Sequence, residues 1–177
     1  MDGAAGGKMA AFMKFNREEL ENTIAATPDV VLANDNSEAQ VVISGTPEAV
    51  ASVMSQVKAK RAVELNVSGA FHSHLMQDAS AQFQTILDGV TFKDARIPVL
   101  SNVEPTPATK EAELKERLVK QMTGSVRWRE IMLQLPAAEI TKVVEVGPGK
   151  VLTGLIKRTC RDIELSNVGT KEQLDNY

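Results

Sequence analysis

Both histidines of the chain lie in residues 68–74, whose sequence is SGAFHSH. Histidine is the side chain whose ordinary pKa lies nearest to neutral pH, so it suits proton transfer. The segment follows an alternating apolar stretch and precedes a helical pattern, and loops between a strand and a helix often carry function in α/β proteins. This segment is therefore a candidate for acid–base chemistry. The alternative is a pair of helix-start histidines that bond to turn amides.

Two further chemistries are weighed at the same segment. A His-x-His pair such as His72 and His74 can chelate a metal ion, but a closed zinc site would need every His and Cys of the chain plus a carboxylate, and Cys160 is remote in sequence. We therefore expect no metal site. Ser73 stands beside His72, but adjacent residues on a helix do not face each other. Ser73 is therefore not expected to be the nucleophile of a Ser-His pair.

A third candidate is the sequence GPGK at residues 147–150, which partly matches a phosphate-binding loop. The Walker A pattern needs Gly where Val144 stands and Ser or Thr where Val151 stands, so the match fails. The segment instead predicts a tight turn from a strand into a helix. Amides at the start of that helix are still suited to face an anion.

The composition sets limits on these interpretations. The chain has 177 residues, 43% of them hydrophobic, and a formal net charge of −3. A chain of this composition has enough apolar surface to fold, and the slight acidity gives no support to a nucleic-acid surface. The single Cys160 excludes an intramolecular disulfide and fits a reducing compartment. No apolar run is long enough to cross a membrane.

The candidate residues must be positioned by two regions of different pattern. Residues 8–68 predict the order β-α-β-β-α-β, which is typical of a ferredoxin-like unit. The expected elements are a strand over 9–15, a helix capped by Asn16 and ended by Pro28, strands over 30–33 and 40–44, a helix begun by Thr46 and Pro47, and a strand over 62–67. The sequence NDNS at 34–37, which includes Asn34 and Asn36, predicts the turn of a hairpin.

The remainder alternates helices and short strands, which indicates a layered α/β body with parallel strands. Helices are expected over 74–89, 110–122, 126–135 and 150–158, and strands over 98–100, 142–146 and 163–168. These strands are too few for a complete doubly wound sheet.

Taken in order, several segments make the chain resemble the malonyl-CoA:acyl carrier protein transacylases. The segments are ANDNS at 33–37, QVVISG at 40–45, GAFHSHLM at 69–76, VLSNV at 99–103, KQM at 120–122, VRW at 126–128 and VEVGPGKVL at 144–152. The resemblance implies an α/β fold with a ferredoxin-like small subdomain at 8–68. Residues 69–177 would form the C-terminal part of an α/β-hydrolase-like large subdomain.

The resemblance also implies an activity and its residues. Members of this family move malonyl from CoA to the phosphopantetheine thiol of acyl carrier protein through a malonyl-serine, with a histidine as base. His72 corresponds to that histidine, and Gln121 to a glutamine whose backbone carbonyl orients the ring. Asn34 and Asn36 match asparagines near the acyl pocket, and Phe71 is the usual marker for malonyl over methylmalonyl. The chain would need no cofactor of its own, because its partner carries the phosphopantetheine.

Several departures from the family pattern qualify this. The chain has no Gly-x-Ser-x-Gly, no Gly-Gln-Gly segment and no arginine placed to pair with the malonyl carboxylate. We expect these in a preceding N-terminal segment, which would make the isolated chain inactive and prone to self-association. His74 stands where many members have Pro, and no role is assigned to it.

Two other interpretations stay open. The chain is alternatively a non-catalytic fragment or binding module that docks onto carrier protein or a separate N-terminal half, or else part of the acyltransferase domain of a polyketide synthase. The absence of secretory features and the lone cysteine favour a cytoplasmic or plastid-stroma location, with no membrane partner.

Overall fold

The computed structural model describes residues 6–177. The chain divides into two compact units, Met1–Trp128 and Arg129–Tyr177. This boundary differs from the expected subdomain division after residue 68, which stays a prediction. Each unit is described by itself below.

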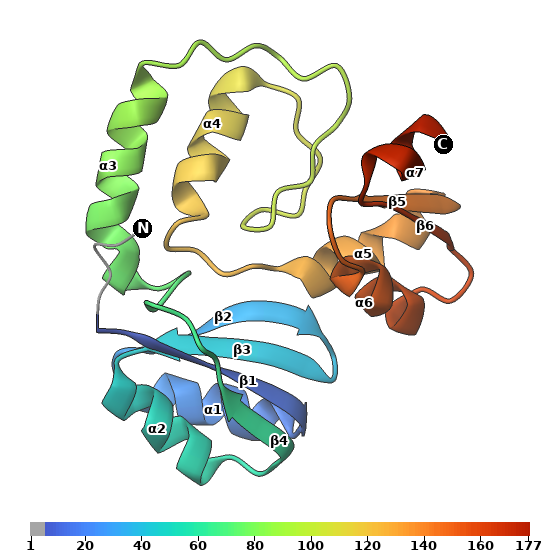
Figure 1. The fold of residues 1–177 in the computed structure, drawn as a ribbon. Helices are drawn as coiled ribbons and strands as arrows, with labels where there is room; N and C mark the ends of the chain where they lie inside the picture. Colours follow the sequence, from blue (N-terminus) through green and yellow to red (C-terminus); the bar gives the residue numbers. More distant parts are fainter. Residues whose placement is uncertain (1–5) are drawn as a thin grey trace. The chain divides into compact units, whose positions relative to one another are not determined.

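The first unit begins with the predicted β-α-β-β-α-β order (Figure 1). Its elements are β1 (Lys8–Phe15), α1 (Arg17–Ala26), β2 (Val30–Ser37), β3 (Gln40–Gly45), α2 (Pro47–Gln56) and β4 (Ala59–Glu64). The four strands form one antiparallel sheet in the order β2-β3-β1-β4. The two central strands, β1 and β3, are therefore the first and third in the chain.

Helices α1 and α2 cover one face of this sheet (Figure 1). Both helices begin at the predicted caps, because Asn16 accepts from the Glu19 amide and Thr46 from the Ala49 amide. Apolar side chains of both helices and of the facing strands are fully buried together, among them Phe12 and Leu20. The periodicity of the sequence predicted this layer because each apolar stripe faces the same core.

One prediction in this region is wrong. Residues 34–37 were expected to form the hairpin turn, but they continue β2, and the turn lies at residues 38–39. The pairing of β2 with β3 shifts in register at two places within this polar stretch, between Leu32 and Asn34 and between Asp35 and Ser37. Its outer edge is also paired, since the Asp35 amide donates to Val126 O over 2.8 Å. Tertiary pairing therefore overrides the turn preference of the local sequence.

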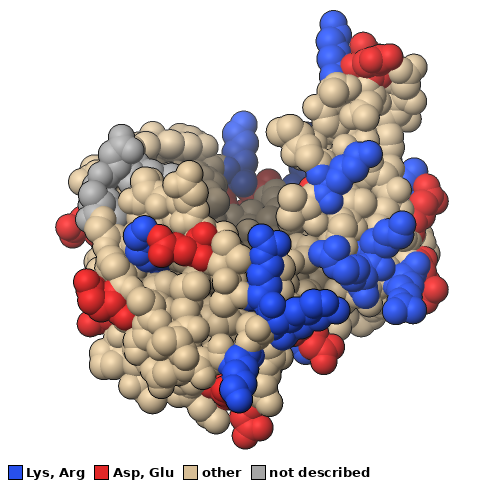
Figure 2. Space-filling model, turned by 60° about the horizontal axis from the view of Figure 1, so that its bottom comes forward, with Lys and Arg blue, Asp and Glu red and all other residues tan. Residues whose placement is uncertain are grey.

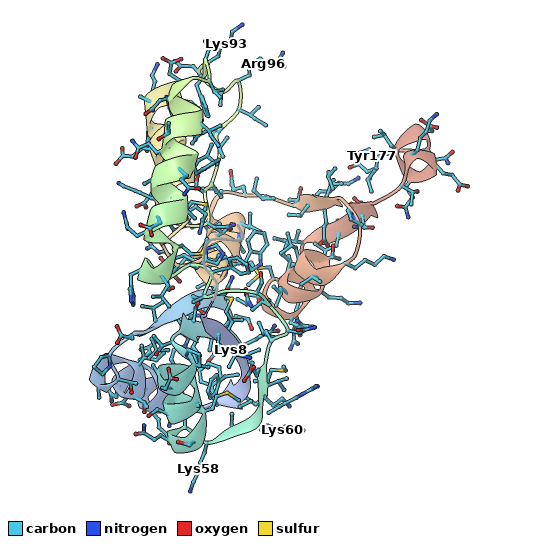
Figure 3. All side chains as sticks on the ribbon, turned by 60° about the vertical axis from the view of Figure 1, so that its left-hand side comes forward. Lys8, Lys58, Lys60, Lys93, Arg96 and Tyr177 are labelled. Atoms are coloured by element: carbon cyan, nitrogen blue, oxygen red, sulfur yellow. The ribbon has the colours of Figure 1, made fainter. Side chains whose placement is uncertain are left out.

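The last strand of the sheet is displaced from its predicted position. It was expected over 62–67, but β4 ends at Glu64. Leu65 and Val67 instead pack with Phe71 against the sheet face opposite the helices. Because β4 is an outer strand, charges at its start discourage the addition of a foreign strand. Figure 3 labels Lys58, which lies just before β4, and Lys60, which lies in it, and both residues are exposed.

The rest of the first unit carries a short 3-10 helix (His74–Met76), α3 (Gln77–Asp88) and α4 (Glu111–Lys120). The two long helices lie side by side (Figure 1), and the buried Ser80 hydroxyl donates to Val119 O of α4 over 3.3 Å. Within the described residues, the segment 98–100 does not form the strand that was expected there. Only an isolated bridge between Val99 and Ala108 forms there, because the segment has a single short partner.

The second unit contains α5 (Trp128–Ala137) from its second residue on, β5 (Lys142–Val146), α6 (Val151–Thr159), β6 (Glu164–Val168) and α7 (Lys171–Asp175). Strands β5 and β6 are parallel, as the alternation of strands and helices predicted. Helix α6 buries Leu155 and Ile156, and the buried Cys160 thiol donates to Met132 O over 3.2 Å.

The surface carries both signs of charge. Figure 2 shows basic and acidic side chains on the same face, with neither sign covering it. Within residues 6–177, no helix is long and apolar enough to cross a membrane.

Candidate active site

The segment that carries both histidines follows β4. His72 lies in a tight turn, and His74 is the first residue of the 3-10 helix. The Ser73 hydroxyl donates to Ala70 O over 2.7 Å and accepts from the Leu75 amide over 3.3 Å. Ser73 is 1% exposed. This serine therefore holds the turn and caps the 3-10 helix.

The backbone of this turn is strained at the histidine itself. His72 has a φ of 60°, in the left-handed region that residues other than glycine rarely adopt. Such conformations persist where the surroundings fix them, and they cluster at functional sites. The neighbouring Ala70 is fully buried against Gly7, and a Cβ on Gly7 would lie 2.3 Å from the Ala70 Cβ. Only glycine at position 7 therefore allows the chain to pass this closely.

The imidazole of His72 is oriented by the C-terminal end of α4. Its Nδ1 lies 3.0 Å from the backbone carbonyl oxygen of Gln121. A carbonyl oxygen can only accept, so Nδ1 carries the proton in the neutral ring and Nε2 keeps its lone pair. This is the tautomer that a base acting through Nε2 requires.

The segment after Gln121 is attached to the edge of the sheet. The Val126 amide donates to Ala33 O over 2.8 Å, and Asn34 and Val126 form an isolated parallel bridge. The Ser125 hydroxyl also approaches Ala33 O at 3.3 Å. The strand that carries Asn34 and the turn that carries Gln121 are thus held together.

These elements enclose a pocket of about 560 Å³ in the first unit. It is lined by Met9, Asn34, Leu65, Val67, Phe71, His72, Met76, Phe83, Leu118, Gln121 and Met122. Most of the lining is apolar, and its polar groups are one imidazole and two amides. A few polar groups within an apolar concavity is the usual make-up of a small-molecule site.

The structure brings four of the five predicted site residues together. His72, Gln121, Phe71 and Asn34 all line the pocket, whereas Asn36 is not among its lining residues. Asn36 lies beyond Asn34 on β2, next to one of the two irregularities in the strand register. The individual roles assigned to these residues remain predictions.

Sequence reasoning missed much of the apolar lining. Phe83, Leu118 and Met122 fall within the helices expected over 74–89 and 110–122, but no role in a site was expected for them, and all three line the pocket. The only signal in the sequence was that these positions are apolar, which does not distinguish pocket lining from core.

His74 lies outside the pocket. Its Nε2 is 3.6 Å from Asp29 Oδ1, and both side chains are more than half exposed. His74 is therefore not among the residues that line the pocket beside His72.

Two other candidate chemistries can be placed. Within the described chain, no group of three or more His, Cys, Asp or Glu residues is arranged to hold a metal ion. In the GPGK segment, Gly147 and Gly149 adopt positive φ, and the carboxylate of Glu145 accepts from the Leu152 and Thr153 amides over 3.1 and 2.8 Å. The anion at the start of α6 is therefore a side chain of the same chain.

In an α/β protein, a histidine oriented by a main-chain carbonyl at an apolar pocket corresponds to the base and its orienting group in an acyl-transfer site, in which a separate nucleophile is also needed. Residues 1–174 match the acyl transferase domain family. The chain belongs to that family.

Individual relatives agree with this assignment. A malonyl CoA-acyl carrier protein transacylase of Synechocystis sp. is 53% identical over 176 residues, covering 99% of this chain and 60% of its own length. Its solved structure superposes with a TM-score of 0.93, covering 98% of this chain and 59% of that one. A Bacillus subtilis transacylase is 38% identical over 179 residues, covering 97% of this chain and 56% of its own length.

A further solved structure is a malonyl-transacylase in complex with a type II polyketide synthase acyl-carrier protein. It is 29% identical with a TM-score of 0.87, and the match covers 98% of this chain and 58% of that one. The chain thus spans less than two thirds of the length of these relatives.

Proposed function

We propose that the chain contributes the histidine-bearing part of a malonyl-CoA:acyl carrier protein transacylase. The observation that carries the proposal is the 3.0 Å contact between His72 Nδ1 and Gln121 O at the edge of the pocket. In a member of an acyl transferase family, such an oriented imidazole is suited to remove a proton from a nucleophile.

The proposed reaction has two half-reactions. In the first, His72 Nε2 takes the proton of a serine hydroxyl while the serine oxygen attacks the malonyl thioester of CoA. The carbon–sulfur bond breaks, and the CoA thiolate leaves with the proton that the imidazolium returns. In the second, His72 takes the proton of the phosphopantetheine thiol of acyl carrier protein, and the sulfur attacks the carbonyl carbon of the malonyl-serine. The carbon–oxygen ester bond breaks, and the imidazolium returns the proton to the serine oxygen.

The remaining assignments follow the same proposal. Gln121 would orient the ring through its carbonyl, Phe71 would favour malonyl over methylmalonyl, and Asn34 and Asn36 would lie near the acyl group. The names of the relatives support malonyl-CoA as donor and acyl carrier protein as partner. No Gly-x-Ser-x-Gly occurs in the chain, so the serine would come from a preceding segment, and the isolated chain is expected to be inactive. We place the protein in the cytoplasm or plastid stroma.

A chimera tests the proposal directly. Residues 1–177 would replace the aligned 176 residues of the Synechocystis relative, and malonyl transfer to holo acyl carrier protein would be measured. We expect activity in the chimera and a loss of about 10²–10⁴-fold in kcat in its His72→Ala variant. His74→Ala is the matched control and should retain activity. An inactive but folded chimera, or an active His72→Ala variant, would contradict the proposal.

A further inference from the structure

Strand β2 shifts its pairing with β3 by one residue immediately before Asn34. Leu32 still pairs with Ile43 in a regular register. The next pair is Asn34 with Val42, so Ala33 is an extra residue in β2. Two residues of one strand opposite a single residue of its partner form a β-bulge, which breaks the alternation of side chains between the two faces of the sheet.

The bulge decides which face of the sheet Asn34 occupies. Leu32 packs against the core beneath α1 and α2, so in a regular strand Asn34, two residues further on, would point into the same core. Because of the bulge, Asn34 instead shares a face with its partner Val42, which is buried on the opposite side of the sheet. Met9 of the same buried cluster lines the pocket together with Asn34. The bulge thus turns the Asn34 amide to the pocket.

The residue after the bulge is held on the helix-covered face by an ion pair. Asp35 pairs with Val41, which lies in the core beneath α1 and α2. Arg17, at the start of α1, has its Nη2 2.9 Å from Asp35 Oδ1, and the two side chains are only 26% and 13% exposed. In a regular strand Asp35 would point to the other face, and its carboxylate would be taken from the guanidinium. Separating two partly buried charges is costly, so the ion pair favours the bulged register.

The main chain around the bulge is bonded from the outer edge of the sheet. Ala33 O accepts from the Val126 amide over 2.8 Å and from the Ser125 hydroxyl over 3.3 Å. The Asp35 amide donates to Val126 O over 2.8 Å. These bonds satisfy backbone groups that do not bond to β3. They involve neither the guanidinium of Arg17 nor the carboxylate of Asp35, so substitutions of those side chains leave the backbone groups available.

We propose that Arg17 is a positioning residue for the pocket. By binding Asp35 on the helix-covered face, its guanidinium holds β2 in the bulged register that turns the Asn34 side chain to the pocket. The meaning of this arrangement for acyl transfer rests on the proposed function, in which Asn34 lies near the acyl group. The register itself does not depend on that function, since it is a property of the isolated chain.

Cross-strand nuclear Overhauser effects in the 177-residue chain report the register directly. In the wild type we expect contacts of Asn34 with Val42 and of Asp35 with Val41. In Arg17→Glu two carboxylates would face each other, so these contacts should be lost and contacts of Asn34 with Val41 should appear. The charge swap Arg17→Glu/Asp35→Arg pairs opposite charges again and should restore the wild-type contacts. Glu21→Gln removes a surface partner of the same guanidinium and is the matched control, in which the contacts should not change.

Wild-type contacts in a folded Arg17→Glu variant, or a charge swap that does not restore them, would overturn the proposal. Folding of each variant is checked by its amide spectrum. If Arg17→Glu does not fold, Arg17→Met, which adds no repulsion, takes its place. The restoring variant is then Arg17→Met/Asp35→Leu, because two apolar side chains on the helix-covered face suit the same core.

A double-mutant cycle in the chimera shows whether Arg17 acts through Asn34. Arg17→Glu and Asn34→Ala should each lower kcat/KM for malonyl-CoA about tenfold, the size expected for one lost hydrogen bond in the pocket. The combined variant should lose no more than Asn34→Ala alone, because the amide that Arg17 positions is already absent. Additive losses would show that Arg17 acts on the reaction independently of Asn34 and would contradict its positioning role.

The register result and the chimera result are independent. The expected cross-strand contacts together with an inactive chimera would contradict only the proposed function. An active chimera together with wild-type contacts in Arg17→Glu would contradict only the role of Arg17.

Discussion

Arg17, at the start of α1, binds both carboxylate oxygens of Asp35 in β2. Its Nη2 lies 2.9 Å from Asp35 Oδ1 and its Nη1 lies 3.3 Å from Oδ2, and Nη2 also donates to Ser37 O over 3.1 Å. The Asp35 side chain is only 13% exposed. This pair fixes the polar end of β2, the strand on which Asn34 reaches the pocket.

The first prediction concerns this pair. Arg17→Lys should lower the free energy of unfolding by about 1–3 kcal/mol, because an ammonium group cannot reproduce a two-pronged bond to a partly buried carboxylate. Urea unfolding followed by circular dichroism measures the change. Glu21→Gln is the control, since Glu21 binds the same guanidinium at the surface with its side chain 53% exposed, and it should change stability by less than about 0.5 kcal/mol. Equal effects of the two substitutions would contradict the prediction.

The second prediction concerns the turn that carries His72. Ser73→Ala removes the bond to Ala70 O and the cap of the 3-10 helix, and it leaves a buried carbonyl without its partner. The expected loss in the free energy of unfolding is about 1–2 kcal/mol. Ser68→Ala, at an exposed serine of the same loop, is the control and should be nearly neutral. Should Ser73→Ala prove as stable as the control, the hydroxyl would not hold the turn.

The third prediction concerns the close passage of two backbones at the site. A Cβ at position 7 would lie 2.3 Å from the Ala70 Cβ and 2.6 Å from the Ala70 amide nitrogen. Gly7→Ala should therefore destabilise the chain by about 1–3 kcal/mol, because the segment before β1 must move. Gly154→Ala in α6 meets only a flexible arginine end at 3.8 Å and should stabilise by up to about 1 kcal/mol. A neutral Gly7→Ala variant in the same thermal or urea measurement would be incompatible with this packing.

Local patterns in the sequence were sufficient for most elements but not for the ends of β2 and β4. The stripes of α1 and α2 and their caps at Asn16 and Thr46 are determined within a few residues, so they were predicted correctly. The fate of residues 34–37 depended on Arg17 and on Val126, which no local pattern connects to them. Strand boundaries are set by such distant partners.

The candidate site shows the same limit. The chemistry of His72 was readable from its residue type and loop, but its partner Gln121 is 49 positions away. Only the family resemblance pointed to Gln121. Neither spacing nor resemblance indicated that Gly124 binds the amide of Gln121 or that Gly7 packs on Ala70. Close approaches of backbone depend on the finished fold, so a lone glycine in the sequence does not announce them.

The last prediction is a dependence of stability on pH in the second unit. The Thr153 hydroxyl donates a hydrogen bond to the Glu145 carboxylate, and so do the amides of Thr153 and Leu152. These bonds, that of the hydroxyl above all, hold the pKa of Glu145 below its ordinary value. Because the pKa is lower in the folded state, this contribution to stability is fully present above the unfolded-state pKa of about 4.3. It is lost as the pH falls through the folded-state pKa. Stability should therefore decline on acidification below about pH 5.

Glu145→Gln should be less stable than the wild type at pH 7 and should lose less stability between pH 7 and pH 4. Urea unfolding at a series of pH values measures both effects. A residual slope is expected in the variant, because Lys110 also lowers the pKa of Asp94 in the first unit. Glu164→Gln, at an exposed carboxylate of β6, is the control and should keep the wild-type slope. Equal losses of stability in Glu145→Gln and the wild type over this range would show that the carboxylate does not cap α6, and the amides of Leu152 and Thr153 would then be available to an external anion.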